Sequence, residues 1–367
     1  MPENEFLSLL TLQHIPHLGD GSIKKLIQHF GSAEAVLQQK KEHLLKVEGI
    51  GEHKLQSFWD EKHSAFAKAE LEHLQTHKIA YSCYTDDDYP QRLKHCIDGP
   101  VVLFQRGNIQ LHQRKIISIV GTRKVTSYGA AFVEKLIEEL APFNPIIVSG
   151  FAYGVDITAH KAALANNLQT VGVLAHGLDK MYPKVHSKYV KDVESNGGFM
   201  TDFWTSDTFV HTNFLQRNRI IAGLSEATIV IESAAKGGSL VTTDFANGYH
   251  RDVFAVPGRT TDPLSIGCNN LIKQHKAHVL TSAADIGYIL NWKLEEEAPL
   301  PVQKRLFVTL EDDEKLIWNF LKEHGKEQLD LIALHCKMPT HKIAGTLLAM
   351  ELKGVIRPLP GKLFEVI

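Results

Sequence analysis

Four short stretches of the sequence carry cationic, polar or hydroxyl side chains suited to holding phosphate, and three of them also contain glycine. Arginine offers phosphate a planar fork of donors, and a glycine turn that opens a helix exposes backbone N–H groups at the positive end of the helix dipole. The stretches contain Gly121, Thr122 and Arg123; Ser149, Gly150, Gly154 and Asp156; Arg217, Asn218 and Arg219; and Lys236, Gly237, Gly238 and Ser239. None supplies an obvious catalytic nucleophile. We therefore predict an anion-binding site.

Two side-chain details refine this prediction. Arg217 and Arg219 lie two positions apart at the start of an expected helix, so they point in different directions. We expect one to be paired internally with a carboxylate and at least one to reach phosphate. Nearby aromatic residues such as Phe151, Tyr153 and Phe214 could stack on nucleic-acid bases.

The elements that would position these residues are alternating strands and helices. Short β-branched runs at 115–120, 145–150, 170–175, 227–233 and 252–258 are bounded by Gly or Pro and are typical of buried parallel strands. Segments of helical length lie between them. This alternation predicts an α/β fold, an extended Rossmann-like doubly wound sheet that binds ligands at the carboxyl ends of its strands. The chain has neither GxGxxG nor GxxxxGK[ST], so neither a standard dinucleotide site nor a P-loop is expected.

Helical segments flank this core on both sides. Residues 1–62 form an expected helical domain with two Gly-x-Gly turns typical of a helix-hairpin-helix, followed by a connecting segment, 63–110, and the core, 111–294. An acidic, Pro-bearing linker at 295–304 precedes three amphipathic helices and a hairpin at 305–367, which predict a winged helix. Its third helix carries only Lys342 and Lys353, which favours packing or protein contact over DNA readout. DNA contact by the N-terminal helices stays open.

Composition narrows the function classes. The 367 residues carry 40 Lys and Arg against 42 Asp and Glu, so any anionic partner must be met by a local patch. Four widely spaced cysteines without a CxxC pair fit reduced thiols. We expect a cytoplasmic protein without a secretion signal or membrane span. His73 and His77 lie one helical turn apart without an evident third ligand, so no metal site is predicted, and we expect no cofactor.

Six motifs in their order and spacing resemble the DNA-processing protein A family, also called Smf. They are GTR, SGFAYGVDITAH, GLDKMYP, RNRIIAGLSEATIVIE, KGGSLVTTDFA and DVFAVPG, within residues 115–290. The resemblance implies a usually dimeric single-stranded DNA binding protein of natural transformation, which protects incoming strands and loads the RecA recombinase on them. It assigns the strand-binding pocket to the four stretches above and adds Lys184 from a Y-P-K motif. A departure is Gly237, which stands where the family commonly has the first serine of S-G-S-L.

Two alternatives use the same turns. Related nucleotide phosphoribohydrolases carry P-G-G-x-G-T-x-x-E with a working glutamate, whereas here Leu240 and Val241 replace Gly-Thr and the shorter Asp244 stands in place of the glutamate. The sequence therefore predicts a protein that is not an enzyme, although Asp156 and Glu232 are possible acids. A non-catalytic sensor of a small nucleotide would fit the same pocket.

Overall fold

The computed structural model describes residues 1–112, 114–293, 310–359 and 363–366. The chain divides into two compact units, Met1–Leu294 and Glu295–Ile367. The predicted linker at 295–304 lies outside the described residues.

A nine-stranded sheet organises the first unit, in the order β1-β2-β6-β5-β4-β3-β7-β8-β9. Its strands are β1 (Ala80–Cys83), β2 (Val102–Gly107), β3 (Ile116–Val120), β4 (Ile146–Ser149), β5 (Thr170–Val173), β6 (Gly197–Thr201), β7 (Ala227–Val230), β8 (Asp252–Ala255) and β9 (His278–Val279). The seven strands β6, β5, β4, β3, β7, β8 and β9 are parallel to one another. At one edge, β2 is antiparallel to both β6 and β1. In β3, Ile117 pairs with Ile147 of β4 and Ala227 of β7, so the chain winds outward in both directions from β3 and β7.

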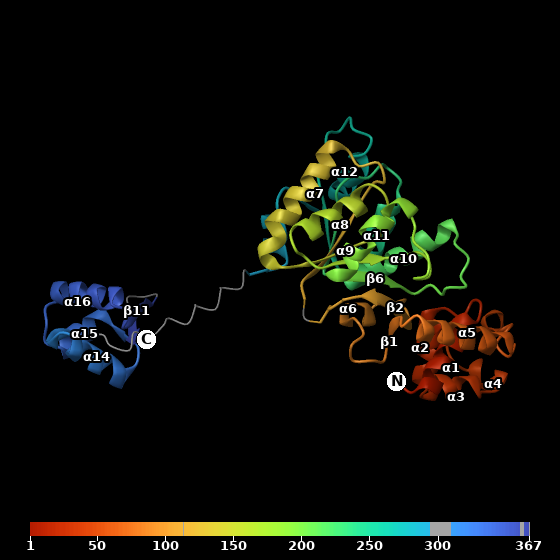
Figure 1. Ribbon diagram of the computed structural model, residues 1–367, viewed down its shortest axis with the longest axis horizontal. Coiled ribbons are helices and arrows are strands. Elements are labelled where there is room, and N and C mark those ends of the chain that lie inside the picture. Colours follow the sequence, from red (N-terminus) through yellow and green to blue (C-terminus); the bar gives the residue numbers. More distant parts are fainter. Residues whose placement is uncertain (113, 294–309, 360–362, 367) are drawn as a thin grey trace. The chain divides into compact units, whose positions relative to one another are not determined.

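Helices cover both faces of this sheet (Figure 1). One face packs against α7 (Ser127–Leu140), α8 (Val155–Ala165) and α13 (Ala283–Ile289), and the other against α10 (His211–Leu224), α11 (Gly238–Gly248) and α12 (Ile266–Lys273). Successive residues of β3 point into the hydrophobic cores on opposite faces of the sheet. Ile117 lies in one core with Val133, and Ile116 lies in the other with Ile220. Shorter pieces are η2 (Ala141–Phe143), η3 (Lys184–Tyr189) and α9 (Val190–Ser195). The predicted doubly wound α/β fold is confirmed.

The N-terminal residues form the expected helices. They are α1 (Glu3–His14), α2 (Asp20–Phe30), α3 (Ala33–Leu37), α4 (Lys41–Leu44), η1 (Glu52–Leu55) and α5 (Lys62–Thr76), followed later by α6 (Gln91–Lys94). The first Gly-x-Gly turn opens α2, but the second opens only the short 3-10 turn η1. Phe6 of α1 shares a core with Phe104 of β2 and Trp204, so these helices pack against the sheet edge that the 63–110 segment builds.

The second unit is the expected winged helix. It contains α14 (Asp312–His324), α15 (Leu329–His335) and α16 (Thr340–Leu352), with β10 (Glu327–Gln328), β11 (Ile356–Leu359) and β12 (Leu363–Val366) in a three-stranded sheet. Ile317, Ile343 and Met350 form its core. The turn of the predicted hairpin, between β11 and β12, falls at 360–362, outside the described residues.

Candidate nucleic-acid interface

The glycine-bearing turns converge at the carboxyl ends of β3, β4 and β7, where the winding of the sheet reverses. Open α/β sheets bind ligands at such a reversal because the loops diverge and leave a crevice. A cavity of about 340 Å³ lies there. Its lining includes Gly121, Thr122, Arg123, Asp156, Arg217, Asn218, Lys236, Gly237, Gly238 and Ser239. The structure therefore brings residues from all four stretches to one cavity.

Arg123 and Lys236 supply its accessible positive charge. Both side chains belong to exposed residues at the rim. The Arg123 guanidinium lies 5.2 Å from the centre of the Phe214 ring, close enough for a cation–π contact that holds it over the opening. Among the described residues, neither Arg123 nor Lys236 takes part in an ion pair. Their charges are therefore available to an anion.

The start of α11 adds backbone donors to the same cavity. Gly237 is the N-cap and Gly238 the first residue of this 11-residue helix. Asn218 donates from Nδ2 to the Gly238 carbonyl at 3.1 Å, which ties α10 to this turn. Ser239 turns its hydroxyl inward to Ser233, at 3.0 Å. The glycine that departs from the family motif leaves the helix N-terminus open, and the backbone N–H groups can point at an anion.

Arg217 lines the cavity from a buried position. It is only 4% exposed, and its Nη1 donates to the carbonyls of Gly150, at 2.8 Å, and Val173. Burial lowers its pKa to about 10, so the guanidinium stays charged at neutral pH. Its Nη1 is thus used by the backbone, and its Nε donates to Asn218 Oδ1 at 3.3 Å, so the side chain is fixed and adds positive charge to the cavity wall.

Two glycines shape the loop that joins β4 to α8. A Cβ atom on Gly150 would lie 2.6 Å from Arg217 Nη2 and 2.7 Å from Asp156 Oδ2, so these two side chains leave room only for glycine at this position. Gly154 has a φ of +75°, and a Cβ there would collide with the backbone of Thr122 and Arg123. Asp156, whose pKa is raised by burial, accepts the Ala152 N–H at 3.3 Å and holds the loop closed.

Arg219 points away from the cavity. Its Nη2 donates to Asp202 Oδ2 at 2.5 Å and to Asp20 Oδ2 at 3.0 Å, and its Nη1 donates to the Asp98 carbonyl. Burial alone would lower the pKa of Arg219, but the carboxylates of Asp202 and Asp20 raise it above the ordinary arginine value. Arg219 therefore joins α10 to the N-terminal helices.

Ser149 and Lys184 also lie outside the cavity lining. The Ser149 hydroxyl is buried and donates to the Ile119 carbonyl at 2.6 Å, which links the ends of β3 and β4. Lys184 is exposed at the start of η3. Its segment reaches the cavity through Tyr182, whose ring centre lies 5.9 Å from that of Phe214.

The cavity lining includes residues that the sequence did not single out. Leu215 and Thr242 line it, and Phe209 contacts the Phe214 ring at 5.4 Å between centres. The GLDKMYP motif pointed to the segment of Tyr182, whereas nothing in the sequence around Phe209 distinguishes it from a loop residue. Of the aromatic residues expected to stack on bases, Phe151 is fully buried and Tyr153 is 46% exposed.

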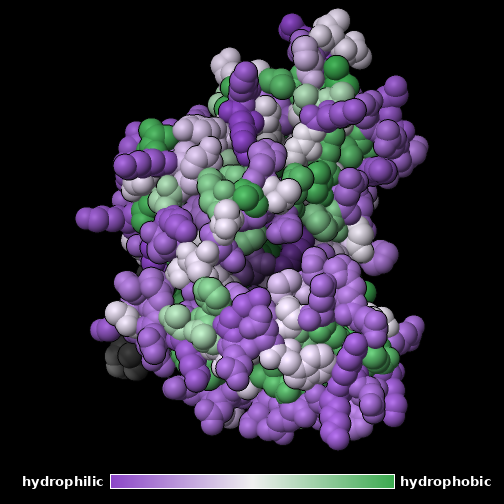
Figure 2. Space-filling view, turned by 90° about the vertical axis from the view of Figure 1, so that its right-hand side faces the viewer, coloured by the Kyte–Doolittle hydropathy of each residue, from purple (hydrophilic) through white to green (hydrophobic). Residues whose placement is uncertain are grey.

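Two of the larger hollows are less suited to phosphate. One, of about 910 Å³, lies where the N-terminal helices meet the sheet, on the side that Figure 2 shows. Both Gly-x-Gly turn regions line it, but Lys54 is engaged with the Ser22 hydroxyl and the Gly49 carbonyl, each at 2.8 Å. Four carboxylates share its lining: Asp20, Asp98, Asp202 and Asp207.

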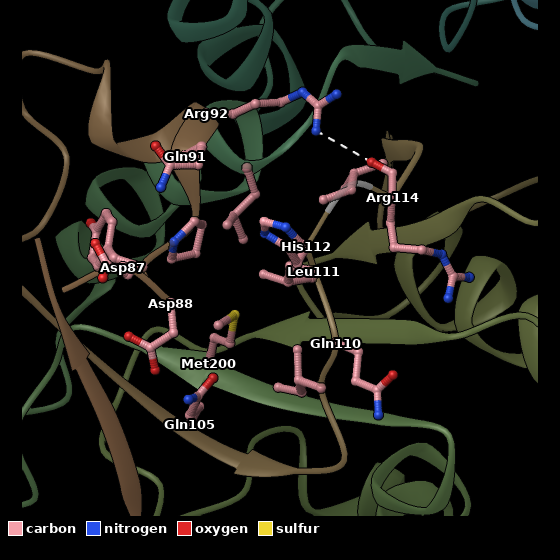
Figure 3. Close-up of a pocket in the computed structure, with 15 residues that line it drawn as sticks. Asp87, Asp88, Gln91, Arg92, Gln105, Gln110, Leu111, His112, Arg114 and Met200 are labelled. Atoms are coloured by element: carbon pink, nitrogen blue, oxygen red, sulfur yellow. Dashed lines mark hydrogen bonds between the residues drawn. The ribbon is translucent and has the colours of Figure 1, made fainter.

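The other hollow, of about 610 Å³, lies near the start of β3 (Figure 3). Its arginines are engaged, because Arg92 pairs with Glu226 at 2.5 Å and Arg114 donates to Asn144 at 3.0 Å. Asp87 and Asp88 add negative charge to its wall. The cavity at β3, β4 and β7 is therefore the better anion site.

The third helix of the winged unit presents little free charge. Lys342 pairs with Asp313 at 2.6 Å, and Lys353 pairs with the buried Glu314 at 2.6 Å. Leu348 and Leu352 are exposed on the same helix. An apolar surface with neutralised lysines is poorly suited to the DNA backbone.

Neither metal clusters nor membrane spans are found in the part of the chain that the structure describes. No three His, Cys, Asp or Glu side chains of these residues converge on a metal position. His73 and His77 stack on each other with ring centres 4.0 Å apart. Among the same residues, every helix is too short or too polar to cross a bilayer.

A sequence profile described as DNA recombination-mediator protein A matches residues 80–291. The chain belongs to this family. The profile of the DprA winged helix domain matches residues 303–362, so the family assignment extends to the second unit. The resemblance that the sequence motifs indicated is confirmed.

Relatives and solved structures of the family agree with this assignment. The chain is 40% identical over 201 residues to the DNA processing protein DprA of Streptococcus pneumoniae, a match that covers 55% of this chain and 71% of that protein. Protein Smf of Escherichia coli is 33% identical over 276 residues, or 74% of each chain. The X-ray structure of DNA processing protein A from Streptococcus pneumoniae matches with a TM-score of 0.67 at 30% identity, covering 80% of this chain and 99% of that one.

A second solved structure concerns the unique single-stranded DNA binding mode of DNA processing protein A from Helicobacter pylori. It matches with a TM-score of 0.52 at 29% identity and covers 57% of this chain and 95% of that one.

Proposed function

We propose that this protein binds single-stranded DNA in the cavity at the carboxyl ends of β3, β4 and β7. The observation that carries the proposal is the convergence of Arg123, Lys236 and the α11 N-terminus on one cavity. Phosphate contacts of this kind give affinity without reading sequence. The single-stranded DNA binding of the Helicobacter pylori relative supports the same ligand class.

The wider role follows from the family. We propose that the protein acts in the cytoplasm during natural transformation, as a homodimer that protects incoming strands and loads RecA on them. Membership in a family of recombination mediators supports a recombinase partner. The test is RecA-dependent ATP hydrolysis on strands coated with single-strand-binding protein, which this protein should accelerate. No acceleration would contradict the loading role.

A hydrolase is the weaker candidate because general acid–base catalysis needs a placed and available carboxylate. Glu232 is held at the start of α7, where it accepts the Thr126 hydroxyl at 2.5 Å and the Thr126 N–H at 3.0 Å. Asp156 lines the cavity but is buried, and its carboxylate accepts the Ala152 N–H, whereas Asp244 is exposed and does not line the cavity. These positions support a non-catalytic role. Release of free base from adenosine or cytidine monophosphate, abolished by Glu232→Ala or Asp156→Ala, would reverse the ranking.

A salt titration tests the binding proposal and separates it from a small-nucleotide sensor. If about four phosphates are neutralised, log K should fall against log salt with a slope on the order of −3, taking about −0.7 per phosphate of a single strand. Affinity should rise with oligonucleotide length and exceed that for duplex. Equal affinity for duplex, or a flat salt response, would overturn the proposal. Tight, saturable binding of a free nucleotide without a length dependence would favour the sensor.

A further inference from the structure

Three aromatic rings gather beside the phosphate cavity from separate parts of the chain. Tyr182 comes from the loop after β5, Phe209 from the loop after β6, and Phe214 from α10. Their ring centres lie 5.1 Å apart for Tyr182 and Phe209, 5.4 Å for Phe209 and Phe214, and 5.9 Å for Tyr182 and Phe214. We call these residues the ring cluster.

The ring cluster is exposed although aromatic side chains normally gain free energy by burial. Tyr182 is 44% exposed and Phe209 is 40% exposed. The rings meet at 55° to 68°, so they touch through edges rather than stacking face to face. Edge contacts keep the rings in place and leave ring faces free for a flat partner.

The ring cluster continues the phosphate cavity along the edge of the sheet. Phe214 lines the cavity and lies beneath Arg123, while Tyr182 and Phe209 extend toward the ends of β5 and β6. From β7 to β5 the sheet has three strand spacings of about 4.8 Å, a path of roughly 14 Å. This path has room for more than one nucleotide.

Exposed cations lie at both ends of the path. Arg123 and Lys236 flank the cavity, and Lys184 begins η3 two residues after Tyr182. A charge at either end and aromatic rings between them form the arrangement by which proteins hold single strands, with phosphates on cations and bases on rings. In this arrangement Lys184 can contact a phosphate of the strand, although Lys184 does not line the cavity.

We propose that Tyr182 and Phe209 form a base-stacking platform for the nucleotides that leave the phosphate cavity toward Lys184. The inference rests on the proposed single-strand binding and adds how the site distinguishes single strands from duplex. A duplex keeps its bases stacked inside and offers none to the rings, whereas every base of a single strand has a free face. The platform therefore recognises unpaired bases of any sequence.

The test compares strands with and without bases on variants of the ring cluster. Phe209→Leu and Tyr182→Leu keep an apolar side chain but remove the ring, and Tyr288→Leu, at a residue 88% exposed on α13, is the matched control. Binding of fluorescent oligothymidine is measured beside the same oligonucleotide with abasic sites. Each ring variant should bind the base-bearing strand on the order of 5- to 150-fold more weakly, the range for loss of one stacked base. The control should bind like the parent.

Two readouts separate the outcomes. The salt slope of the ring variants should match the parent, because their phosphate contacts remain, and abasic strands should bind parent and variants alike. Parent-like binding of base-bearing strands by both ring variants would overturn the platform while leaving the phosphate cavity intact. Equal losses on base-bearing and abasic strands would also overturn it and indicate a structural role for the rings. A parent protein that fails to bind single strands at all would instead overturn the proposed function.

Discussion

Arg219 and Asp202 form a buried ion pair at 2.5 Å, and Asp20 of the N-terminal helices shares the same guanidinium at 3.0 Å. The side chains of Arg219, Asp202 and Asp20 are 12%, 11% and 17% exposed. Little water reaches them, so each charge is stabilised mainly by the opposite charge beside it. The two arginines of the RNR stretch therefore differ in role. Arg217 supports the cavity from below, and Arg219 fastens the N-terminal helices to the sheet.

Replacing Arg219 should therefore cost stability. In Arg219→Met, two carboxylates stay buried without their partner, and removing one member of a buried pair costs about 3–5 kcal/mol. We expect a clearly lower unfolding temperature and urea midpoint for Met1–Leu294. The exposed Arg259→Ala serves as the control and should unfold like the parent. An Arg219→Met protein that unfolds like the parent yet loses strand binding would contradict this role.

Gly150→Ala should disturb the cavity without touching a charged residue. The new Cβ would lie 2.6 Å from Arg217 Nη2 and 2.7 Å from Asp156 Oδ2, so the loop must shift, at a cost of about 1–3 kcal/mol for overpacking. Strand binding and unfolding temperature should both fall. Gly248→Ala, at the end of α11 with open space around it, should leave both unchanged or raise stability slightly. Equal behaviour of the two alanine variants would show that the close approach at Gly150 is not required.

His160 should make the protein acid-sensitive. Its Nδ1 faces the Thr170 hydroxyl at 2.7 Å, its Nε2 is buried without a partner in the described structure, and burial lowers its pKa to about 3. The unfolded value is about 6.5, so between these pH values the unfolded chain binds the extra proton. The stabilisation is complete above about pH 6.5 and is lost as pH falls toward 3, with a slope of up to about 1.4 kcal/mol per pH unit. Urea unfolding across this range should show a shallower slope for His160→Asn, and an unchanged slope would contradict the assignment.

The lysines of the winged unit should matter for folding and not for DNA. Lys353 pairs with Glu314, whose side chain is 5% exposed, so Lys353→Ala should lower the unfolding temperature of the second unit. Lys342→Ala removes a more exposed pair and should have little effect on stability. Neither change should alter binding of duplex DNA by the full chain in gel shifts. A marked loss of duplex binding in both variants would contradict this prediction and indicate that the third helix of the winged unit contacts DNA.

The sequence predicted the central fold well because its five apolar runs are β-branched and clearly bounded. The runs at 115–120 and 227–233 became β3 and β7, and the turns after them meet as parallel strands require. Strand β6 was not predicted from the sequence because it begins with Gly197 and Gly198, and glycine is depleted in strands. Strands β1 and β2 were not predicted because their short sequences mix polar and apolar residues without a strand pattern. They are strands because they pair with each other and because β2 pairs with β6.

Within the site, local spacing identified the loops but not the direction of every side chain. An internal partner was expected for one arginine of the RNR stretch, yet Asp20 lies 199 residues from Arg219, so the sequence could not name it. Phe151 adopts a φ of +58° in its tight loop and its ring is buried in the core, which removes it from any contact with bases. The ring of Phe209 lies beside the cavity because it packs against Tyr182 and Phe214, and these tertiary contacts could not be read from the sequence.

The most direct test of the central claim is strand binding by Arg123→Ala at moderate salt. Arg123 is exposed at the cavity rim, so its loss should weaken binding of oligothymidine by about 1.5–3 kcal/mol, the range for hydrogen bonds to charged groups, with little change in unfolding temperature. Lys184→Ala should cost less, because a flexible ammonium lacks the fixed fork. Arg259→Ala, an equally charged change at another exposed position, should bind like the parent. If Arg123→Ala binds strands as tightly as the parent and Arg259→Ala do, the cavity at β3, β4 and β7 is not the DNA site.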